Sequence, residues 1–140
     1  MNAQHPVPPT RKLADFEGHW SLTRDIVDEN GPPAFFEGEA HWTPQGDNLA
    51  YLEAGLLTVK GLAPIQGERR YLWGPDLTVY FEDGRVFHHV PARGGPVSHW
   101  CDPDQYDGRY DFTHWPSFEV EWQVSGPRKA YRMTSTYRRV

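Results

Sequence analysis

The chain has 140 residues, a length that suits one folded domain and is too short for two domains with separate cores. Its net charge of −5, from 14 basic and 19 acidic residues, provides no basic stripe for phosphates and argues against nucleic acid as a partner. No apolar run approaches the roughly 20 residues of a membrane span, no signal-peptide pattern opens the chain, and the single cysteine, Cys101, fits a reducing compartment, so we expect a cytoplasmic protein without a membrane partner.

Residues 1–12 are expected to form a flexible lead-in, because Met1 to Thr10 is polar and rich in proline. The folded domain is predicted over residues 13–140, and one helical turn is predicted at Leu13 to Phe16. From there on, apolar and polar residues alternate in short runs that Gly, Pro, Asn and Asp clusters interrupt. No segment shows the apolar periodicity of a helix.

Nine or ten short strands follow from this alternation, and the clearest of them is Phe118 to Val124. A series of this kind must close or stack to protect its edges. We therefore predict an all-β domain that forms a single antiparallel up-and-down barrel of eight to ten strands. A β-sandwich is the alternative, but polar residues on otherwise apolar faces favour a barrel with a cavity. The expected strands cover residues 16–26, 36–42, 49–57, 69–73, 77–82, 85–90, 97–101, 109–113, 118–124 and 130–138.

Asp83-Gly84 predicts a hairpin between two of these strands. The sequence fits a two-residue turn and also a three-residue turn with a glycine bulge. The choice decides whether Phe81 shares a face with Val86 and His88 or with Arg85, Phe87 and His89. Both registers are open at this stage.

The first strand opens with Gly18-His19-Trp20, a G-x-W motif that resembles the opening motif of lipocalins and other calycins. The resemblance implies that Trp20 closes one end of the barrel and that Arg138 or Arg139 packs over its ring. Residues 13–140 as a whole resemble short bacterial and fungal lipocalin-like domains of unknown function. This wider resemblance implies a fold and a cavity but no activity, and it is carried by residues 16–20, 81–88, 99–106 and 126–129.

Charged side chains on apolar faces are the most informative irregularity. Arg24 shares a face with Trp20, Glu53 shares one with Tyr51, and Arg69 shares one with Tyr71. A charge inside a barrel must be paired or solvated. One interpretation is an internal ion pair of Arg24 or Arg69 with Glu53. The other is a wet pocket whose arginines hold an anionic ligand, and the two interpretations are compatible.

A second group, His99-x-Cys101-x-x-Asp104-x-Tyr106, offers materials for acid–base or nucleophilic catalysis. Neighbours on one strand face stand roughly 6 to 7 Å apart, which is too far for His99 to activate the Cys101 thiol directly. The simpler interpretation is a small buried cysteine followed by an Asp102-Pro103 turn.

We expect no metal site and no cofactor, because no H-x-x-x-H, H-E-x-x-H or C-x-x-C spacing occurs and His88 and His89 point to opposite faces. His19 and His41 fall on outward faces. A three-ligand site at His99, Cys101 and a histidine across the barrel is a minor alternative. Haem is another, by analogy with calycins, and its candidate axial ligands are His89, His99 and His114.

The sequence thus predicts a barrel that binds a small anionic or aromatic metabolite. A cofactor-independent isomerase, lyase or hydrolase is the alternative, with His99, Asp104 or Tyr106 as the catalytic group. The sequence leaves the oligomeric state open, and a homodimer is one of the alternatives. Lys129 lies in a Gly126-Pro127 turn near the barrel mouth, where it either faces solvent or points over the cavity. The predicted ligand-binding residues are Arg24, Glu53, Arg69, Tyr71, His89, His99, Tyr106, Lys129 and Tyr131.

Overall fold

The computed structural model describes residues 9–140, so the predicted lead-in over residues 1–12 falls largely outside the described residues. A single 3₁₀ turn, η1, precedes ten antiparallel strands. The elements are η1 (Leu13–Asp15), β1 (Gly18–Asp28), β2 (Ala34–Gln45), β3 (Asn48–Val59), β4 (Ile65–Trp73), β5 (Thr78–Phe81), β6 (Val86–His89), β7 (Gly95–Cys101), β8 (Asp104–Asp111), β9 (Phe118–Ser125) and β10 (Ala130–Arg139).

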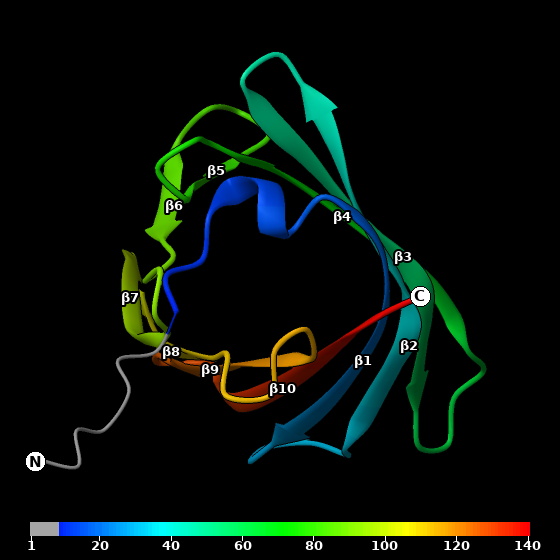
Figure 1. Ribbon diagram of the computed structural model, residues 1–140. Helices are drawn as coiled ribbons and strands as arrows, with labels where there is room; N and C mark the ends of the chain where they lie inside the picture. Colours follow the sequence, from blue (N-terminus) through cyan, green and yellow to red (C-terminus); the bar gives the residue numbers. More distant parts are fainter. Residues whose placement is uncertain (1–8) are drawn as a thin grey trace, which may run out of the picture.

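The strands form one sheet in the order β6-β5-β4-β3-β2-β1-β10-β9-β8-β7. Strands that follow each other in sequence pair side by side except for β6 and β7, and β1 pairs with β10, so the first and last strands are neighbours. The sheet curls into a ring, and β6 and β7 meet without forming a ladder (Figure 1). The predicted all-β up-and-down barrel is confirmed, in a nearly closed form.

Burial alternates along the strands as a barrel requires. In β9 every second residue is buried, beginning with Phe118, and the intervening residues are exposed. In β1, Trp20, Leu22 and Arg24 point inward. Period-2 patterning therefore decides which side chains meet in the interior.

Two predicted strand boundaries were wrong. β8 begins at Asp104 rather than near Arg109, so Asp104 and Tyr106 belong to a strand that pairs with β7. β4 begins at Ile65 and forms a long hairpin with β3. The missed parts of both strands lack a regular alternation of buried apolar and exposed polar residues, and backbone pairing sustains them instead, a situation that an alternation rule does not detect.

One end of the barrel is closed by aromatic side chains. Phe16, directly after η1, is fully buried, and the Trp20 indole Nε1 donates a hydrogen bond to its carbonyl oxygen over 2.9 Å. The η1 segment lies inside the ring in the view of Figure 1. The rings around Phe16, at centroid distances of 5.0 to 5.8 Å, are those of Trp42, Trp73, Trp115 and Phe118.

The G-x-W motif takes the arrangement that the resemblance implied. Gly18 has a φ of +127°, a backbone conformation that favours glycine. The guanidinium of Arg139, not that of Arg138, lies 4.1 Å from the centre of the Trp20 ring. It also donates to the carbonyl oxygens of Glu17 and Asp15. Arg139 of β10 thus ties the last strand to the segment that contains η1.

Candidate functional site

The interior of the barrel holds a cavity of about 350 Å³. Its wall comes from most of the strands and combines charged, phenolic and aromatic side chains. The closed aromatic end forms its floor, since Trp42, Trp73 and Phe118 contribute to the lining. The polar residues of the wall are Arg24, Tyr51, Glu53, Arg69, Tyr71, Arg85, His88, His99, Cys101, Tyr106, Tyr110, Tyr131, Ser135 and Tyr137.

Arg24 and Glu53 form an ion pair inside the barrel. Nη1 and Nη2 of Arg24 donate to the two oxygens of Glu53 over 2.7 and 3.0 Å, and Nε donates to the Ser135 hydroxyl over 2.7 Å. The Tyr51 hydroxyl donates to Glu53 over 2.7 Å and lies 2.8 Å from the Tyr137 hydroxyl. The internal-pair interpretation of the sequence therefore holds for Arg24.

The pair is ionised in spite of its burial. Burial acts to raise the pKa of Glu53, but the hydrogen bond and the positive charge of Arg24 outweigh it and hold that pKa below its usual value. Burial raises the pKa of Tyr51 and brings that of Tyr137 to about 12, so both phenols are neutral. The network is therefore electrically neutral and largely satisfied, and it forms a fixed polar surface of the cavity.

Arg69 is different from Arg24. It lines the cavity from β4 and is exposed to solvent. Among the described residues it makes no ion pair. Its neighbour Tyr71 is mostly buried, which raises the pKa of that phenol, and the charge of Arg69 opposes the shift. Arg69 is thus a cation at the rim of the cavity that makes no direct ion pair among the described residues, although its charge helps to lower the pKa of Glu53, its partner across the β3–β4 ladder.

A wall of stacked rings faces the cavity. Phe81 and Phe87 stack with centroids 4.7 Å apart, and Phe87 stacks on Trp122 at 5.2 Å, with interplanar angles of 17° and 18°. His99 and Tyr106 lie opposite each other on β7 and β8 and approach the same rings at their edges. Such a wall offers flat apolar area to a ligand.

The β5–β6 hairpin settles the register that the sequence left open. Thr78 pairs with His89 and Val79 with His88, while Tyr80 pairs with Val86, so one strand carries an irregularity. Phe81 therefore shares the interior with Phe87, and His88 is buried in the wall as well.

His88 is a site residue that the sequence analysis did not select. Its Nε2 lies 2.8 Å from the Tyr110 hydroxyl, and its Nδ1 is buried without a partner among the described residues. Burial lowers the pKa of His88 to about 3, so the ring is neutral at physiological pH. The ring therefore lines the cavity as a neutral group, while its unpaired Nδ1 is shielded from solvent.

The other predicted residues lie in different environments. His89 is exposed on the outer side of β6 and His114 is exposed beyond β8, and neither lines the cavity. Lys129 also lies outside the lining, and its Nζ stands 3.1 Å from Asp104. Tyr131 does line the cavity. The structure therefore assembles the predicted binding residues around one cavity except for His89 and Lys129.

The residues of the predicted catalytic group lie on the β7–β8 hairpin, but not all of them line the cavity. His99, Cys101 and Tyr106 line the cavity, whereas the buried Asp104 is turned to Lys129 and is not part of the wall. The thiol of Cys101 is exposed. Asp104 is opposite Cys101 in the β7–β8 ladder, but its carboxylate is paired with Lys129 and does not line the cavity.

The described part of the chain contains no helix long and apolar enough to cross a membrane.

Comparison with known proteins gives one family and one fold. The family described as "Family of unknown function (DUF6314)" matches residues 16–139. No curated protein sequence matches. Among solved structures, the chain is similar to the S-type phycobiliprotein lyase CPES from Guillardia theta, with a TM-score of 0.65 at 9% identity over 91% of this chain and 90% of that one. At this identity the likeness concerns the fold alone.

Proposed function

The chain belongs to the DUF6314 family of unknown function, and we propose that its barrel binds a small, flat, anionic molecule in the interior cavity. As part of the same proposal, we assign the chain to the calycin superfamily. The packing of Arg139 over Trp20 and the similarity in fold to a phycobiliprotein lyase support that assignment.

The observation that carries the proposal is the difference between Arg24 and Arg69. Glu53 neutralises Arg24 within the network, while Arg69 at the rim makes no direct ion pair among the described residues. A guanidinium that makes no direct ion pair, beside a cavity with an aromatic wall, is suited to a carboxylate or a similar planar anion, to which it can donate two parallel hydrogen bonds.

The shape and lining of the cavity support a flat ligand of modest size. A volume of about 350 Å³ lies near the lower end of ligand pockets, roughly 300 to 1,000 Å³. The stacked rings of Phe81, Phe87 and Trp122 offer a plane, and the neutral His88 ring adds a polar group to the wall. An aromatic acid matches all three features.

The test uses two fluorescent probes of nearly the same shape. 8-Anilino-1-naphthalenesulfonate is a flat aromatic anion, and N-phenyl-1-naphthylamine is its uncharged counterpart. Both are titrated into the protein and into the variant Arg69→Gln. We expect the variant to bind the sulfonate about tenfold more weakly, which corresponds to one lost charge-assisted contact, and to bind the neutral probe unchanged.

Arg70→Gln is the matched control, because Arg70 lies on the same strand, faces outward and pairs with Glu68 at 2.9 Å. It should bind both probes as the unmodified protein does. Equal loss of the sulfonate in both variants would show a general charge effect and contradict a role of Arg69. Loss of both probes in Arg69→Gln alone would contradict a contact with the anionic group.

The alternatives of an enzyme and a haem protein have less support. A catalytic role for Asp104 conflicts with its ion pair to Lys129 outside the cavity wall. Of the three histidines considered for haem, only His99 lines the cavity. The exposed thiol of Cys101, the one cysteine of the chain, supports the proposal of a reducing, cytoplasmic location.

A further inference from the structure

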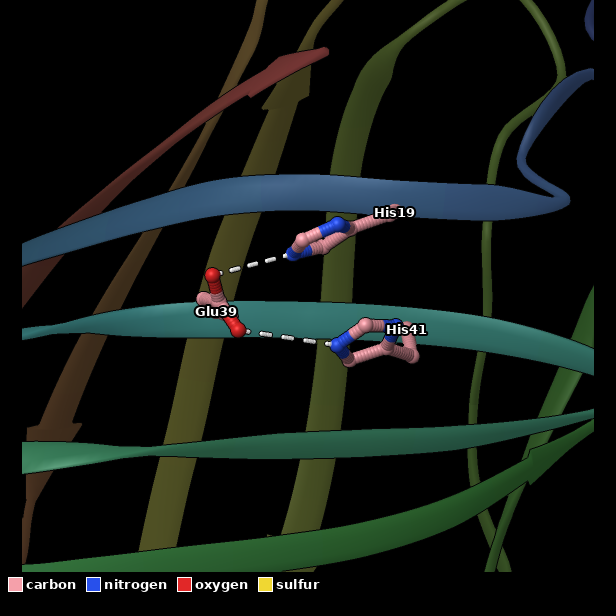
Figure 2. A group of neighbouring side chains, drawn as sticks. All are labelled: His19, Glu39 and His41. Carbon is pink, nitrogen blue, oxygen red and sulfur yellow. Dashed lines mark ion pairs between the residues drawn. The ribbon is translucent and has the colours of Figure 1, made fainter. Parts of the chain in front are cut away.

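Three potential metal ligands lie together on the outer face of the barrel, away from the cavity: His19 of β1 and Glu39 and His41 of β2 (Figure 2). The register of the sheet brings them together. His19 stands directly opposite His41, and Glu39 lies two residues from His41 on the same face. Because the group comes from two strands, it has no metal-binding spacing along one segment of the sequence.

The distances within the cluster suit a small metal ion. Nε2 of His19 lies 3.1 Å from Oε1 of Glu39, and Nε2 of His41 lies 3.8 Å from Oε2. One potential ligand atom from each of the three residues lies within 4.8 Å of the other two. In a tetrahedral zinc site with bonds of about 2.0 to 2.1 Å, ligand atoms stand about 3.3 Å apart. Small side-chain rotations would bring the three groups to that separation.

The nitrogen of His19 that faces the cluster needs a partner. Its Nε2 is shielded from solvent and makes no hydrogen bond of acceptable geometry among the described residues, although Glu39 is close. The two imidazole rings stack with centroids 4.2 Å apart and an interplanar angle of 14°, so they hold both Nε2 atoms toward the same carboxylate. A metal bond would satisfy the shielded nitrogen.

No arginine or lysine among the described residues forms an ion pair with the Glu39 carboxylate. On the outer face, Arg70 of β4 is engaged by Glu68, with 2.9 Å between Nη2 and Oε1. Arg138 of β10 is separated from Glu39 by Ser21 of β1, which pairs with both positions. Within the described residues, the ion-pair partners of Glu39 are His19 and His41 alone.

We propose that His19, Glu39 and His41 bind a zinc ion on the outer face of the barrel. Two imidazole nitrogens and one carboxylate oxygen form a three-ligand set that zinc accepts, and a fourth position is left for water or for a donor from another molecule. Calcium and magnesium prefer sites built from oxygen ligands. The site is independent of the ligand proposed for the cavity.

Zinc binding to the metal-free, tag-free protein tests the proposal by calorimetry, and Co²⁺ serves as a coloured substitute followed by its visible absorption. We expect one ion per chain. Glu39→Gln and His41→Ala should each weaken zinc binding by at least about 100-fold, since loss of a direct ligand costs no less than loss of the groups that orient it. Both variants should also lose the Co²⁺ absorption.

Glu37→Gln and His89→Ala are the control variants, because both residues are exposed, of the same types and outside the cluster. They should bind zinc as the unmodified protein does. NMR of the imidazole groups adds a direct reading, in which zinc should shift the signals of His19 and His41 together. Absence of saturable binding would overturn the proposal and leave the cluster as a carboxylate beside two stacked histidines. Saturable binding that survives both ligand variants would overturn it too, by placing the metal elsewhere.

Discussion

Arg24 and Glu53 meet inside the barrel in a bidentate ion pair, with nitrogen–oxygen distances of 2.7 and 3.0 Å and side chains that are 8% and 3% exposed. Arg24 comes from β1 and Glu53 from β3, so the pair spans the inner face of β2. Charges this deep are tolerated because each oxygen of Glu53 and each type of nitrogen in Arg24 has a partner.

Removing one partner of this pair should destabilise the fold strongly. Arg24→Met leaves the Glu53 carboxylate buried without a cation, and we expect a loss of about 3 to 5 kcal/mol in the free energy of unfolding. Urea unfolding followed by tryptophan fluorescence measures it. Arg70→Met, which breaks an exposed pair, should cost under about 1 kcal/mol. A loss in Arg24→Met as small as that of the control would mean that water reaches the pair.

The neutral state of His88 predicts a pH dependence of stability. Burial lowers the pKa of His88 from 6.5 to about 3 in the folded protein. Between these two pH values the unfolded chain therefore binds a proton at His88 and the folded protein does not. The neutral His88 ring therefore leaves the free energy of unfolding undiminished above pH 6.5. As the pH falls toward 3, His88 lowers the free energy of unfolding with a slope approaching about 1.4 kcal/mol per pH unit.

Urea unfolding between pH 7 and 4.5 tests this, because most carboxylates titrate below that range. His88→Gln should remove this slope, whereas His89→Gln, one residue along and exposed, should keep it. An equal slope in the protein and in His88→Gln would show that His88 is protonated in the folded state at these pH values.

Arg139 should be worth more to stability than its neighbour Arg138. Its guanidinium covers Trp20 at 4.1 Å and donates to the carbonyl oxygens of Glu17 and Asp15. We expect Arg139→Ala to cost about 2 to 3 kcal/mol and the exposed Arg138→Ala under about 0.5 kcal/mol. The melting temperatures of the two variants are compared by thermal unfolding. Equal melting temperatures would show that Arg139 has no particular role in closing the barrel.

The architecture was predictable from the sequence where one strand face is buried and the other wet. Phe118 to Val124 alternates so regularly that its inward residues could be named, and the G-x-W motif identified Trp20 as the residue that closes one end. Side-chain orientation along a single strand depends on local periodicity alone, and the sequence displays that periodicity directly.

Relations between strands were harder to predict. Strand register decides which arginine pairs with Glu53 and which of the adjacent His88 and His89 lines the cavity. The irregularity between Val79 and Tyr80 turns His88 inward and leaves His89 outside. The cluster of His19 and His41 on the outer face has the same origin, because its members come from two strands. A single sequence does not specify directly the register in which two strands pair.

Gly108 of β8 offers a test of the cavity wall itself. A Cβ atom at this position would stand 2.7 to 2.9 Å from three atoms of the Trp122 ring, so Gly108→Ala must push the indole aside. Because Trp122 stacks on Phe87 and lines the cavity, the displaced ring should reduce the space for a ligand and weaken binding of both naphthalene probes. Gly67→Ala is the control, since its Cβ would meet a single atom at an ordinary contact distance of 3.5 Å. If Gly108→Ala binds both probes like Gly67→Ala, then the probes bind outside the space that Trp122 bounds, and the aromatic wall is a packing feature of the barrel rather than part of a binding site.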